Sequence, residues 1–380
     1  MNSSPAIHHS HLNSAAQILQ LYDGSIPFTH FIKNYFSQQK KFGSRDRKQI
    51  SNLCYSFFRL GKSFLHVPIK ERILLSLKNN NESTQPHWQQ IISQFSLPEG
   101  EPENIFPWKN KLSETIDSTA FEASFATQPD LFLRIRPGHE KSVLQKLNNA
   151  NIEHNLEGSA IRLANAAKVE DVLKMNHEVV VQDASSQNIA QFFETVKGYF
   201  LPNQTISLFD CCAASGGKSI LAKDTLNNIN LTVSDIRPSV IANLKKRFLQ
   251  AGIANYQSFV LDITNENTFN PKQQFDLVIA DVPCTGSGTW ARTPEQLYYF
   301  NEDRIEVYAL LQAKILQNAM QWVKPGGFLL YITCSIFEKE NEAQIQIPLQ
   351  NNFTLINSAL IKGYNRNADT MYGGLLKKVV

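Results

Sequence analysis

Two cysteines stand directly after apolar runs that have the character of buried strands. Cys284 lies in "LVIADVPCTGSG" and Cys334 in "LLYITCS". A cysteine thiolate is a nucleophile that can form a covalent bond to a substrate carbon. A buried cysteine is often only a small apolar filler, which is a sufficient explanation for Cys54. It does not explain two cysteines at the ends of two central strands, so we predict that both take part in a reaction.

Acidic residues end four neighbouring predicted strands. Asp210 ends "TISLFD", and the next three are Asp235 in "LTVSD", Asp262 in "YQSFVLD" and Asp281 in "FDLVIAD". The carboxyl ends of parallel strands meet at one edge of a sheet, where such sheets bind ligands. A single aspartate at a strand end is usually a turn former or a helix cap. Four of them at one edge predict a binding site.

The loop at 213–217, "AASGG", consists of small residues and precedes a predicted helix. It lets a ligand approach the backbone at a helix N-terminus, but it is neither a Walker loop nor a G-x-G-x-x-G loop. Asp235 is placed to accept hydrogen bonds from two ribose hydroxyls, and Asp262 from an adenine amino group. An adenosine ligand without phosphates, in a sheet of this kind, indicates S-adenosylmethionine.

The two cysteines indicate which atom receives the methyl group. Most acceptors need no enzyme thiol, and the amine-methylating signatures NPPY and DPPY are absent, with "DVPC" in their place. Carbon 5 of a pyrimidine does need a thiol, because it becomes nucleophilic only after a thiolate has added to carbon 6. Asp281 is placed to hydrogen-bond the N3 and amino edge of cytosine and to stabilise the adduct. The residues alone leave open whether Cys284 or Cys334 attacks.

The elements that must position these groups form an α/β fold. From about residue 205, strands and helices alternate with short links, which predicts a doubly wound, mostly parallel sheet. Before it, residues 130–180 indicate a small α+β unit with a helix at 167–175. The strand arginines of that unit, Arg134 and Arg136, either touch a polyanion or lie exposed.

The N-terminal part has helical spacing and a concentrated positive charge. Residues 12–75 are predicted to be helical, with Ser44 as an N-cap, and 76–105 to form a loose connection. The net charge of the chain is only +3 and the pI about 8.4. The segment 33–72, however, holds ten basic and two acidic residues, a net charge of +8. Such a patch suits a phosphate backbone, and a solvated helical surface is the alternative.

Several kinds of site are not expected. The 5 cysteines include no CxxC and no Cys/His ligand spacing, so we expect neither a disulfide framework nor a metal. His8, His9 and His11 are interpreted as part of a solvated, disordered terminus. The sequence shows no signal-peptide pattern and no apolar run of membrane-spanning length, so we expect a cytoplasmic protein without a membrane partner.

Five motifs resemble the RsmB/NSUN family of RNA cytosine-5 methyltransferases. They are "VQDASSQ", "DCCAASGGKS", "SDIRPSVIANLKKR", "DVPCTGSGTWARTPE" and "KPGGFLLYITCS", and the match covers roughly 130–380. The resemblance implies that Cys334 is the nucleophile, that Cys284 helps to release the methylated RNA, and that Asp281 is catalytic as well. It makes Arg292 an RNA or structural contact. The residues that it implies for S-adenosylmethionine are Cys212, Ala213, Ala214, Ser215, Gly216, Gly217, Lys218, Asp235, Arg237, Asp262 and Asp281.

The resemblance also implies three domains. Residues 1–125 would be a helical NusB-like RNA-binding region with a linker, 126–180 an RRM-like α+β subdomain, and 181–380 a Rossmann-like class I methyltransferase domain. The expected partner is RNA, and the NusB-like region favours 16S ribosomal RNA over transfer RNA. We expect a monomer. The alternatives are a transfer RNA methyltransferase, a non-catalytic RNA-binding assembly factor on the same fold, and a methyltransferase for a protein or small molecule.

The chain departs from the family pattern at three places. The first loop of the family usually reads "CAAPGGKT", and Ser215 stands here in place of the proline. We expect this change to loosen the loop without preventing cofactor binding. Ala291 replaces the first of two arginines, so one basic contact is missing. The tail, residues 369–378, fits the closing strand of the family only loosely.

Overall fold

The computed structural model describes residues 5–79, 86–265 and 273–380 and divides into two compact units. Unit 1 and unit 2 interleave along the chain. Unit 1 comprises residues 1–110, 117–128 and 290–302, and unit 2 comprises residues 111–116, 129–289 and 303–380. The short stretch 290–302 therefore belongs to unit 1, although the residues on both sides of it belong to unit 2.

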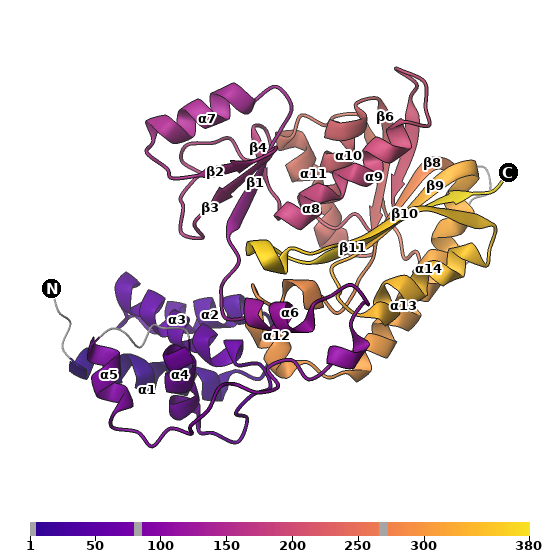
Figure 1. The fold of residues 1–380 in the computed structure, drawn as a ribbon. Coiled ribbons are helices and arrows are strands. Elements are labelled where there is room, and N and C mark those ends of the chain that lie inside the picture. Colours follow the sequence, from indigo (N-terminus) through magenta and orange to yellow (C-terminus); the bar gives the residue numbers. More distant parts are fainter. Residues whose placement is uncertain (1–4, 80–85, 266–272) are drawn as a thin grey trace. The chain divides into compact units, whose positions relative to one another are not determined.

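Unit 1 consists of helices around an apolar core (Figure 1). Apolar side chains recur every three or four residues along these helices, so each helix buries one face. The helices are α1 (Pro5–Leu21), α2 (Phe28–Gln38), α3 (Ser44–Arg59), α4 (Ile69–Asn79), α5 (Pro86–Ile92), α6 (Ser118–Ser124) and α12 (Pro294–Tyr299). Helix α12 is held by the Tyr299 hydroxyl, which donates to the carbonyl of Tyr22 at 2.7 Å.

The first helix corrects the interpretation of the N-terminal histidines. Helix α1 begins at Pro5, and both His8 and His11 are 7% exposed. They lie at helical spacing from Leu12 and Ala15, which belong to the core, so the histidine rings are carried to the buried face. The expectation of a solvated, disordered terminus is therefore wrong for these two residues.

The cap of α3 also differs from the prediction. Ser44 is the first residue of the helix, and Gly43 is its N-cap. The Asp46 carboxylate accepts a hydrogen bond from the Gly43 amide at 3.0 Å, which satisfies a backbone donor at the helix start. Ser44 is therefore not the N-cap, and the acidic residue in the first turn does the capping.

Unit 2 contains a seven-stranded sheet, which confirms the predicted doubly wound, mostly parallel architecture (Figure 1). Its order is β10-β11-β9-β8-β5-β6-β7. Neighbouring strands from β9 to β7 are parallel, and β11 is antiparallel to β9 and β10. The strands are β5 (Ile206–Asp210), β6 (Ile229–Asp235), β7 (Tyr256–Val260), β8 (Phe275–Asp281), β9 (Val323–Thr333), β10 (Phe353–Ile361) and β11 (Met371–Lys378). The tail is thus a sheet strand, as the family pattern implied.

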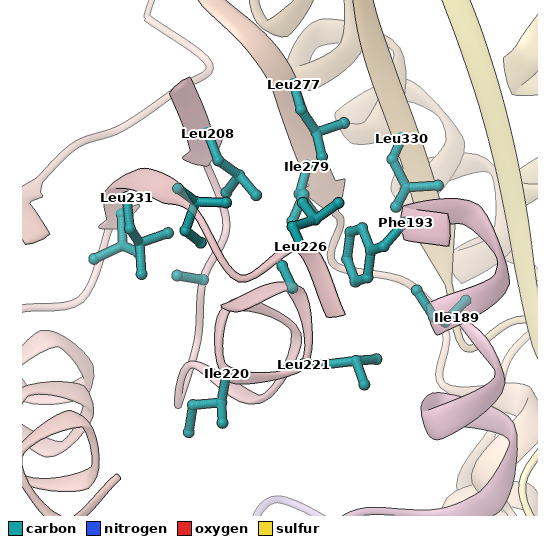
Figure 2. Packing of buried hydrophobic residues seen from close by; sticks show 14 of the residues in the cluster. Ile189, Phe193, Leu208, Ile220, Leu221, Leu226, Leu231, Leu277, Ile279 and Leu330 are labelled. Carbon is teal, nitrogen blue, oxygen red and sulfur yellow. The ribbon is translucent and has the colours of Figure 1, made fainter. Parts of the chain in front are cut away.

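Helices cover both faces of this sheet. One face packs against α9 (Ala190–Lys197), α10 (Gly217–Leu226) and α11 (Pro238–Gln250), and the other against α13 (Asp303–Ala319) and α14 (Glu342–Leu349). The short helix α8 (Ala184–Asn188) contacts Phe132 of a second, smaller sheet through Ala184. Figure 2 shows the first core, in which Phe193 of α9 and Leu221 and Leu226 of α10 lie near Leu208 and Ile279 of the central strands. Strands buried on both faces explain the nearly continuous apolar runs of the sequence.

A second, four-stranded sheet in unit 2 has the order β2-β3-β1-β4, and all its neighbouring pairs are antiparallel. Its elements are β1 (Leu131–Ile135), α7 (Glu140–Asn149), β2 (Asn155–Glu157), β3 (Ala160–Leu163) and β4 (Val179–Val181). The helix predicted at 167–175 does not form. The segment holds isolated turns. The Lys174 amide donates a hydrogen bond to the Glu178 carboxylate at 2.9 Å, whereas in a continuous helix it would donate to a backbone carbonyl.

The strand arginines of this small sheet have an internal partner. Arg134 and Arg136 both form ion pairs with Asp224 of α10, at 2.6 and 2.7 Å. All three side chains are largely buried, at 5%, 14% and 7% exposure. The proposed contact with a polyanion and the exposed alternative are therefore both wrong, because the guanidinium groups are used to attach the small sheet to the large one.

Candidate active site at the carboxyl ends of the strands

The two cysteines that the sequence separates by 50 residues meet just beyond the carboxyl ends of β8 and β9. Their sulfur atoms are 3.2 Å apart. Strands β8 and β9 are parallel neighbours, with Asp281 paired to Ile332, so the turns that follow them emerge side by side. The turn after β8 is held to Cys334 by the Gly288 amide, which donates to the Cys334 carbonyl at 2.8 Å. A neighbouring sulfur and burial raise the pKa of the Cys284 thiol well above its ordinary value.

A cavity of about 540 Å³ opens beside the cysteines at this edge of the sheet. It is lined by three of the four strand-end aspartates and by both cysteines. The predicted site residues on its wall are Cys212, Ala214, Asp235, Arg237, Asp262, Asp281, Cys284 and Cys334. The fourth aspartate, Asp210, is fully buried beneath the loop and accepts a hydrogen bond from Ser219 at 2.6 Å. Asp210 is therefore not part of the cavity wall, because its carboxylate lies below the backbone that forms that wall.

The same cavity has apolar walls that sequence reasoning missed. Ile236 directly follows Asp235, and Ile263 directly follows Asp262. Leu311 and Ile315 lie one turn apart on α13. An apolar slot beside carboxylates suits a flat, partly polar ring such as adenine. The apolar residues Ile236 and Ile263 could have been predicted as wall residues, because they adjoin Asp235 and Asp262 in the sequence. The contribution of α13 could not, because it depends on the packing of that helix against the sheet.

Asp235 already has donors around both of its carboxylate oxygens. Oδ2 accepts from the Ala214 amide at 3.1 Å, and Oδ1 from the Arg237 amide and Nε, both at 3.0 Å. Burial works to raise the pKa of Asp235, but the Arg237 hydrogen bonds outweigh it and hold the pKa below its ordinary value. The carboxylate therefore stays ionised and can accept ribose hydroxyls once the Arg237 side chain, which is 61% exposed, moves aside. Asp262 is exposed on the same wall.

Two residues of the glycine-rich loop, Ala214 and Gly216, have positive φ angles. Gly216 has φ of +80° and is the N-cap of α10, and a Cβ there would lie 2.5 Å from the Phe248 ring. Ser215, the departure from the family proline, receives a hydrogen bond on Oγ from Arg247 Nη1 at 2.8 Å. This hydrogen bond restrains the loop where proline would have done so, which opposes the expectation of a loosened loop.

A second cavity of about 330 Å³ lies on the other side of Asp281 and Cys334. Ala214, Asp281 and Cys334 line both cavities. Lys218 Nζ lies 3.2 Å from Asp281 Oδ2, so the lysine faces this second, more polar space. Of the predicted cofactor residues, Ala213, Ser215, Gly217 and Lys218 line only this second cavity, and Gly216 lines neither. The wall that the two cavities share is therefore where two ligands would meet.

Polar residues behind the cysteines were also missed. Glu340 is fully buried and accepts hydrogen bonds from Thr285, Ser335 and Gln312. Thr285 and Ser335 follow the two cysteines directly, so their types could have been noticed in "PCT" and "TCS". Nothing in the sequence distinguishes Glu340 from the acidic residues on either side of it. Within the part of the chain that the structure describes, no group of three or more His, Cys, Asp or Glu side chains is placed to hold a metal ion.

The basic segment of unit 1 is divided between surface and interior. Arg59 and Arg72 are buried, at 8% and 1% exposure, and Arg72 donates to the Gly61 carbonyl at 2.7 Å. The exposed basic residues are Lys33, Lys40, Lys41, Arg45 and Lys48. Arg59 also donates to the Ala291 carbonyl at 3.2 Å. Arg292, the predicted RNA or structural contact, is partly buried in the same unit.

Comparison with known proteins gives relatives of similar sequence. A family model described as 16S rRNA methyltransferase RsmB/F matches residues 199–369. Ribosomal RNA small subunit methyltransferase B of Yersinia enterocolitica is 29% identical over 231 residues, which are 59% of this chain and 52% of that protein. The protein of the same name from Vibrio vulnificus is 30% identical over 273 residues, 68% of this chain and 61% of that protein. The chain thus spans about half to three-fifths of the length of these relatives.

Solved structures agree in fold. PH0851 superimposes with a TM-score of 0.71 at 18% identity and covers 100% of both chains. NSun6 from Pyrococcus horikoshii with SFG has a TM-score of 0.62 at 12% identity, over 72% of this chain and 97% of that chain. With the strand order, these likenesses show the fold of a class I methyltransferase. No helix in residues 5–79, 86–265 or 273–380 has the length and apolar character needed to cross a membrane.

Proposed function

This chain belongs to the RsmB/F (NSUN) family of RNA cytosine-5 methyltransferases, which depend on S-adenosylmethionine, and from that premise we propose that it methylates carbon 5 of a cytosine in RNA. One observation carries the proposal. The two cysteine sulfurs lie 3.2 Å apart beside Asp281, on the wall that two cavities share. Carbon-5 methylation requires a cofactor and a base to meet at a thiol, and this wall offers that arrangement.

The larger cavity fits S-adenosylmethionine. Asp235 would accept from the ribose hydroxyls and Asp262 from the adenine amino group, between the apolar walls formed by Ile236, Ile263 and Ile315. The backbone of the loop at Cys212 and Ala214 borders the same space. When bound, the cofactor supplies an electrophilic methyl group at the wall shared with the second cavity.

In the proposed reaction, Cys334 attacks carbon 6, and Cys284 stabilises the attacking thiolate and later helps to remove the carbon-5 proton. The raised pKa of Cys284 supports this division, because a protonated Cys284 donates its S–H to a Cys334 thiolate and stabilises it. Asp281, held by Lys218, would hydrogen-bond the N3 and amino edge of the cytosine as charge develops on the ring. After methylation, Cys284 would lose its own proton to solvent and then accept the carbon-5 proton. The electron pair of that C–H bond re-forms the double bond between carbons 5 and 6, the bond between Cys334 and carbon 6 breaks with its electrons returning to the sulfur, and 5-methylcytosine is released.

We propose 16S ribosomal RNA as the substrate, as the names of the relatives suggest. The base must leave its stack to reach the cysteine, so a loop or an opened helix is the expected target. We propose that the helical N-terminal part, residues 1–125, contributes RNA binding through its exposed basic residues. The β2-β3-β1-β4 order with α7 supports an RRM-like part within residues 126–180. We further propose that residues 181–380 bind the cofactor and that the protein acts as a cytoplasmic monomer.

The proposal is tested with the full-length protein, total cellular RNA and labelled S-adenosylmethionine. We expect Cys334→Ala to transfer no methyl group, because no thiolate can add to carbon 6. We expect Cys284→Ala to remain covalently bound to RNA on a denaturing gel, because release is blocked. Cys54→Ala is the control, since Cys54 is buried in unit 1, and it should keep the wild-type activity.

Each other outcome excludes one part of the proposal. Methylation by Cys334→Ala would reject that residue as the nucleophile. Sequencing of the trapped RNA decides between 16S ribosomal RNA and transfer RNA. RNA binding by the wild-type protein without methyl transfer would indicate an assembly factor, and labelled protein in RNase-treated extract would indicate another class of substrate.

A further inference from the structure

Glu340 is a buried carboxylate placed behind both cysteines. It ends the short 3-10 helix η6 (Glu338–Glu340), six residues after Cys334, and its residue exposure is 0%. It lines neither the larger nor the smaller cavity of the site. It therefore has no direct route to a substrate or a cofactor, and any part it has in the reaction must act through its neighbours.

The donors to Glu340 come from the residues that follow the cysteines. Thr285 donates its amide to Oε2 at 2.8 Å and its hydroxyl to Oε1 at 2.6 Å. Ser335 donates its hydroxyl to Oε1 at 2.6 Å. Thr285 is bonded directly to Cys284, and Ser335 to Cys334, so one carboxylate joins the turns after β8 and β9.

A third donor comes from α13. Gln312 Nε2 lies 3.0 Å from Glu340 Oε2 and also 3.0 Å from the carbonyl of Pro283, the residue before Cys284. Cys284 is therefore restrained on both sides through groups that Glu340 organises. The Tyr331 hydroxyl donates to the Glu340 carbonyl at 2.6 Å and fixes the backbone of the carboxylate itself.

Ser287 closes the network. Its Oγ lies 3.0 Å from Thr285 Oγ1 and 3.2 Å from Ser335 Oγ, and it accepts the Ile336 amide at 3.0 Å. An ionised carboxylate can only accept hydrogen bonds, so the hydroxyls and the amides that contact Glu340 must all act as donors. This fixes the direction of most hydrogen bonds in the network. Because both carboxylate oxygens of Glu340 are satisfied, the network specifies one arrangement of the two turns that it joins.

The negative charge of Glu340 also affects the protonation state of Cys284. Burial raises the pKa of Glu340, and the donors from Ser335, Thr285 and Gln312 oppose that rise. When ionised, Glu340 disfavours a second negative charge nearby, and it adds to the effect of Cys334 and burial in keeping Cys284 protonated. The group that fixes the geometry thus also favours the thiol form of Cys284.

We propose that Glu340 is the positioning residue that holds the Cys284 and Cys334 turns at the separation needed for attack and release, a role that rests on the proposed function. Attack at carbon 6 and removal of the carbon-5 proton require both sulfurs on one base, and a misplacement of about 1 Å costs on the order of a hundredfold in rate. Without Glu340, Thr285 and Ser335 lose their common acceptor, and the two turns are no longer tied to each other.

The first test is single-turnover methylation by the full-length Glu340→Gln variant. The glutamine amide has nearly the shape of the carboxylate, but its NH₂ group cannot accept the hydrogen bonds that one oxygen of Glu340 accepts. We expect the rate constant for methyl transfer to fall by roughly tenfold to a hundredfold, with cofactor affinity unchanged. A merely structural role would lower the amplitude, through a smaller folded fraction, and leave the rate constant unaltered.

Asp276→Asn is the matched control. Asp276 accepts from Ser207 and Lys324 at the opposite end of the same strands, and it should lose stability without a change in the rate constant. Two milder variants keep the test informative if Glu340→Gln does not fold. Thr285→Val and Ser335→Ala each remove one hydroxyl and leave the carboxylate in place. Each should lower the rate constant by less than Glu340→Gln does. Rate constants equal to that of Asp276→Asn in all three variants would overturn the proposal.

A second test needs no methylation. Diamide, an azo oxidant, takes two electrons and two protons from a pair of neighbouring thiols, which become a disulfide while diamide is reduced to the hydrazine. With sulfurs 3.2 Å apart, we expect the wild-type protein and Asp276→Asn to form the Cys284–Cys334 disulfide, as peptide mass mapping would show, and Glu340→Gln to form it about tenfold more slowly. Equal rates would reject the positioning role. If the wild-type protein methylates no RNA, the proposed function fails, and this assay still decides the role of Glu340.

Discussion

At the scale of single residues, two aspartates of unit 2 have opposite electrostatic surroundings. Asp210 is fully buried, and burial raises its pKa to about 7 despite the hydrogen bond from Ser219. Asp276 is partly buried too, but the Lys324 and Ser207 hydrogen bonds outweigh burial and lower its pKa. Asp210 at the carboxyl end of β5 and Asp276 at the amino end of the adjacent strand β8 therefore respond to pH in opposite directions.

The prediction at this scale concerns stability between pH 4 and pH 8. Because the pKa of Asp210 is raised in the folded state, its contribution is fully present below about pH 4 and is lost as the pH rises through 7. An asparagine side chain does not titrate, so the Asp210→Asn variant does not lose this stability as the pH rises. Its free energy of unfolding relative to wild type should therefore rise with pH, by up to about 4 kcal/mol for a pKa shift of this size.

Thermal unfolding of wild type and Asp210→Asn across this pH range measures the effect. Asp276→Asn is the control with the opposite sign. Its lowered pKa stabilises the folded state above about pH 4, so the variant should be weakened at pH 7 and nearly equal to wild type at low pH. A constant difference between Asp210→Asn and wild type at every pH would show that Asp210 does not titrate as expected.

At the scale of elements, a buried ion-pair cluster attaches the small sheet to the large one. Arg134 and Arg136 of the small sheet enclose Asp224 of α10, and Arg136 also donates to the Ala251 carbonyl at 2.5 Å. Burying a charge is unfavourable unless its partner is present. The cluster is consequently more sensitive to the loss of its shared carboxylate than an exposed pair would be.

We expect Asp224→Asn to destabilise unit 2 by about 3–5 kcal/mol, because it leaves two buried guanidinium groups without a counter-charge. The measurement is the urea midpoint of the unfolding transition. Glu194→Gln breaks the exposed Lys197–Glu194 pair on α9 and should change stability by less than about 1 kcal/mol. If the two variants unfold at the same urea concentration, the cluster contributes no more than a surface pair.

At the scale of the whole molecule, the division into units changes how RNA binding should be tested. Residues 290–302 follow the Cys284 turn in sequence and share the core of unit 1. Deleting residues 1–125 would therefore strip that stretch of its partners as well as removing the basic segment. Changing surface charge in the full-length chain avoids this difficulty.

We expect the triple variant Lys40→Ala, Lys41→Ala, Arg45→Ala to weaken RNA binding and to lower its salt dependence. Each lost phosphate contact reduces the slope of log K against log salt by about 0.7–0.9. Cofactor affinity should not change. The control removes three charges outside this segment, at Lys197, Lys223 and Lys314. RNA affinity and salt slope equal to wild type in the first variant would rule out the basic segment as an RNA contact.

The sequence by itself determined the chemistry and the layered sheet. Strand-end position placed Asp235, Asp262 and Asp281 on one cavity wall, and the alternation of nearly continuous apolar strands with helices predicted the parallel sheet. Both are local signals, because a strand end and a repeating pattern are properties of a short segment. The resemblance added the assignment of roles to Cys284 and Cys334, which the residues alone left open.

Only the tertiary structure decided which groups meet. It brought two sulfurs to 3.2 Å, buried Asp210 away from the cavity, turned Arg134 and Arg136 inward, and placed Glu340 behind both cysteines. Those outcomes depend on contacts between segments tens to hundreds of residues apart, and a charged side chain shows in its sequence neighbourhood no sign of the partner that will make its burial favourable. The transfer of 290–302 to unit 1 has the same origin, since packing against distant segments outweighs local preference.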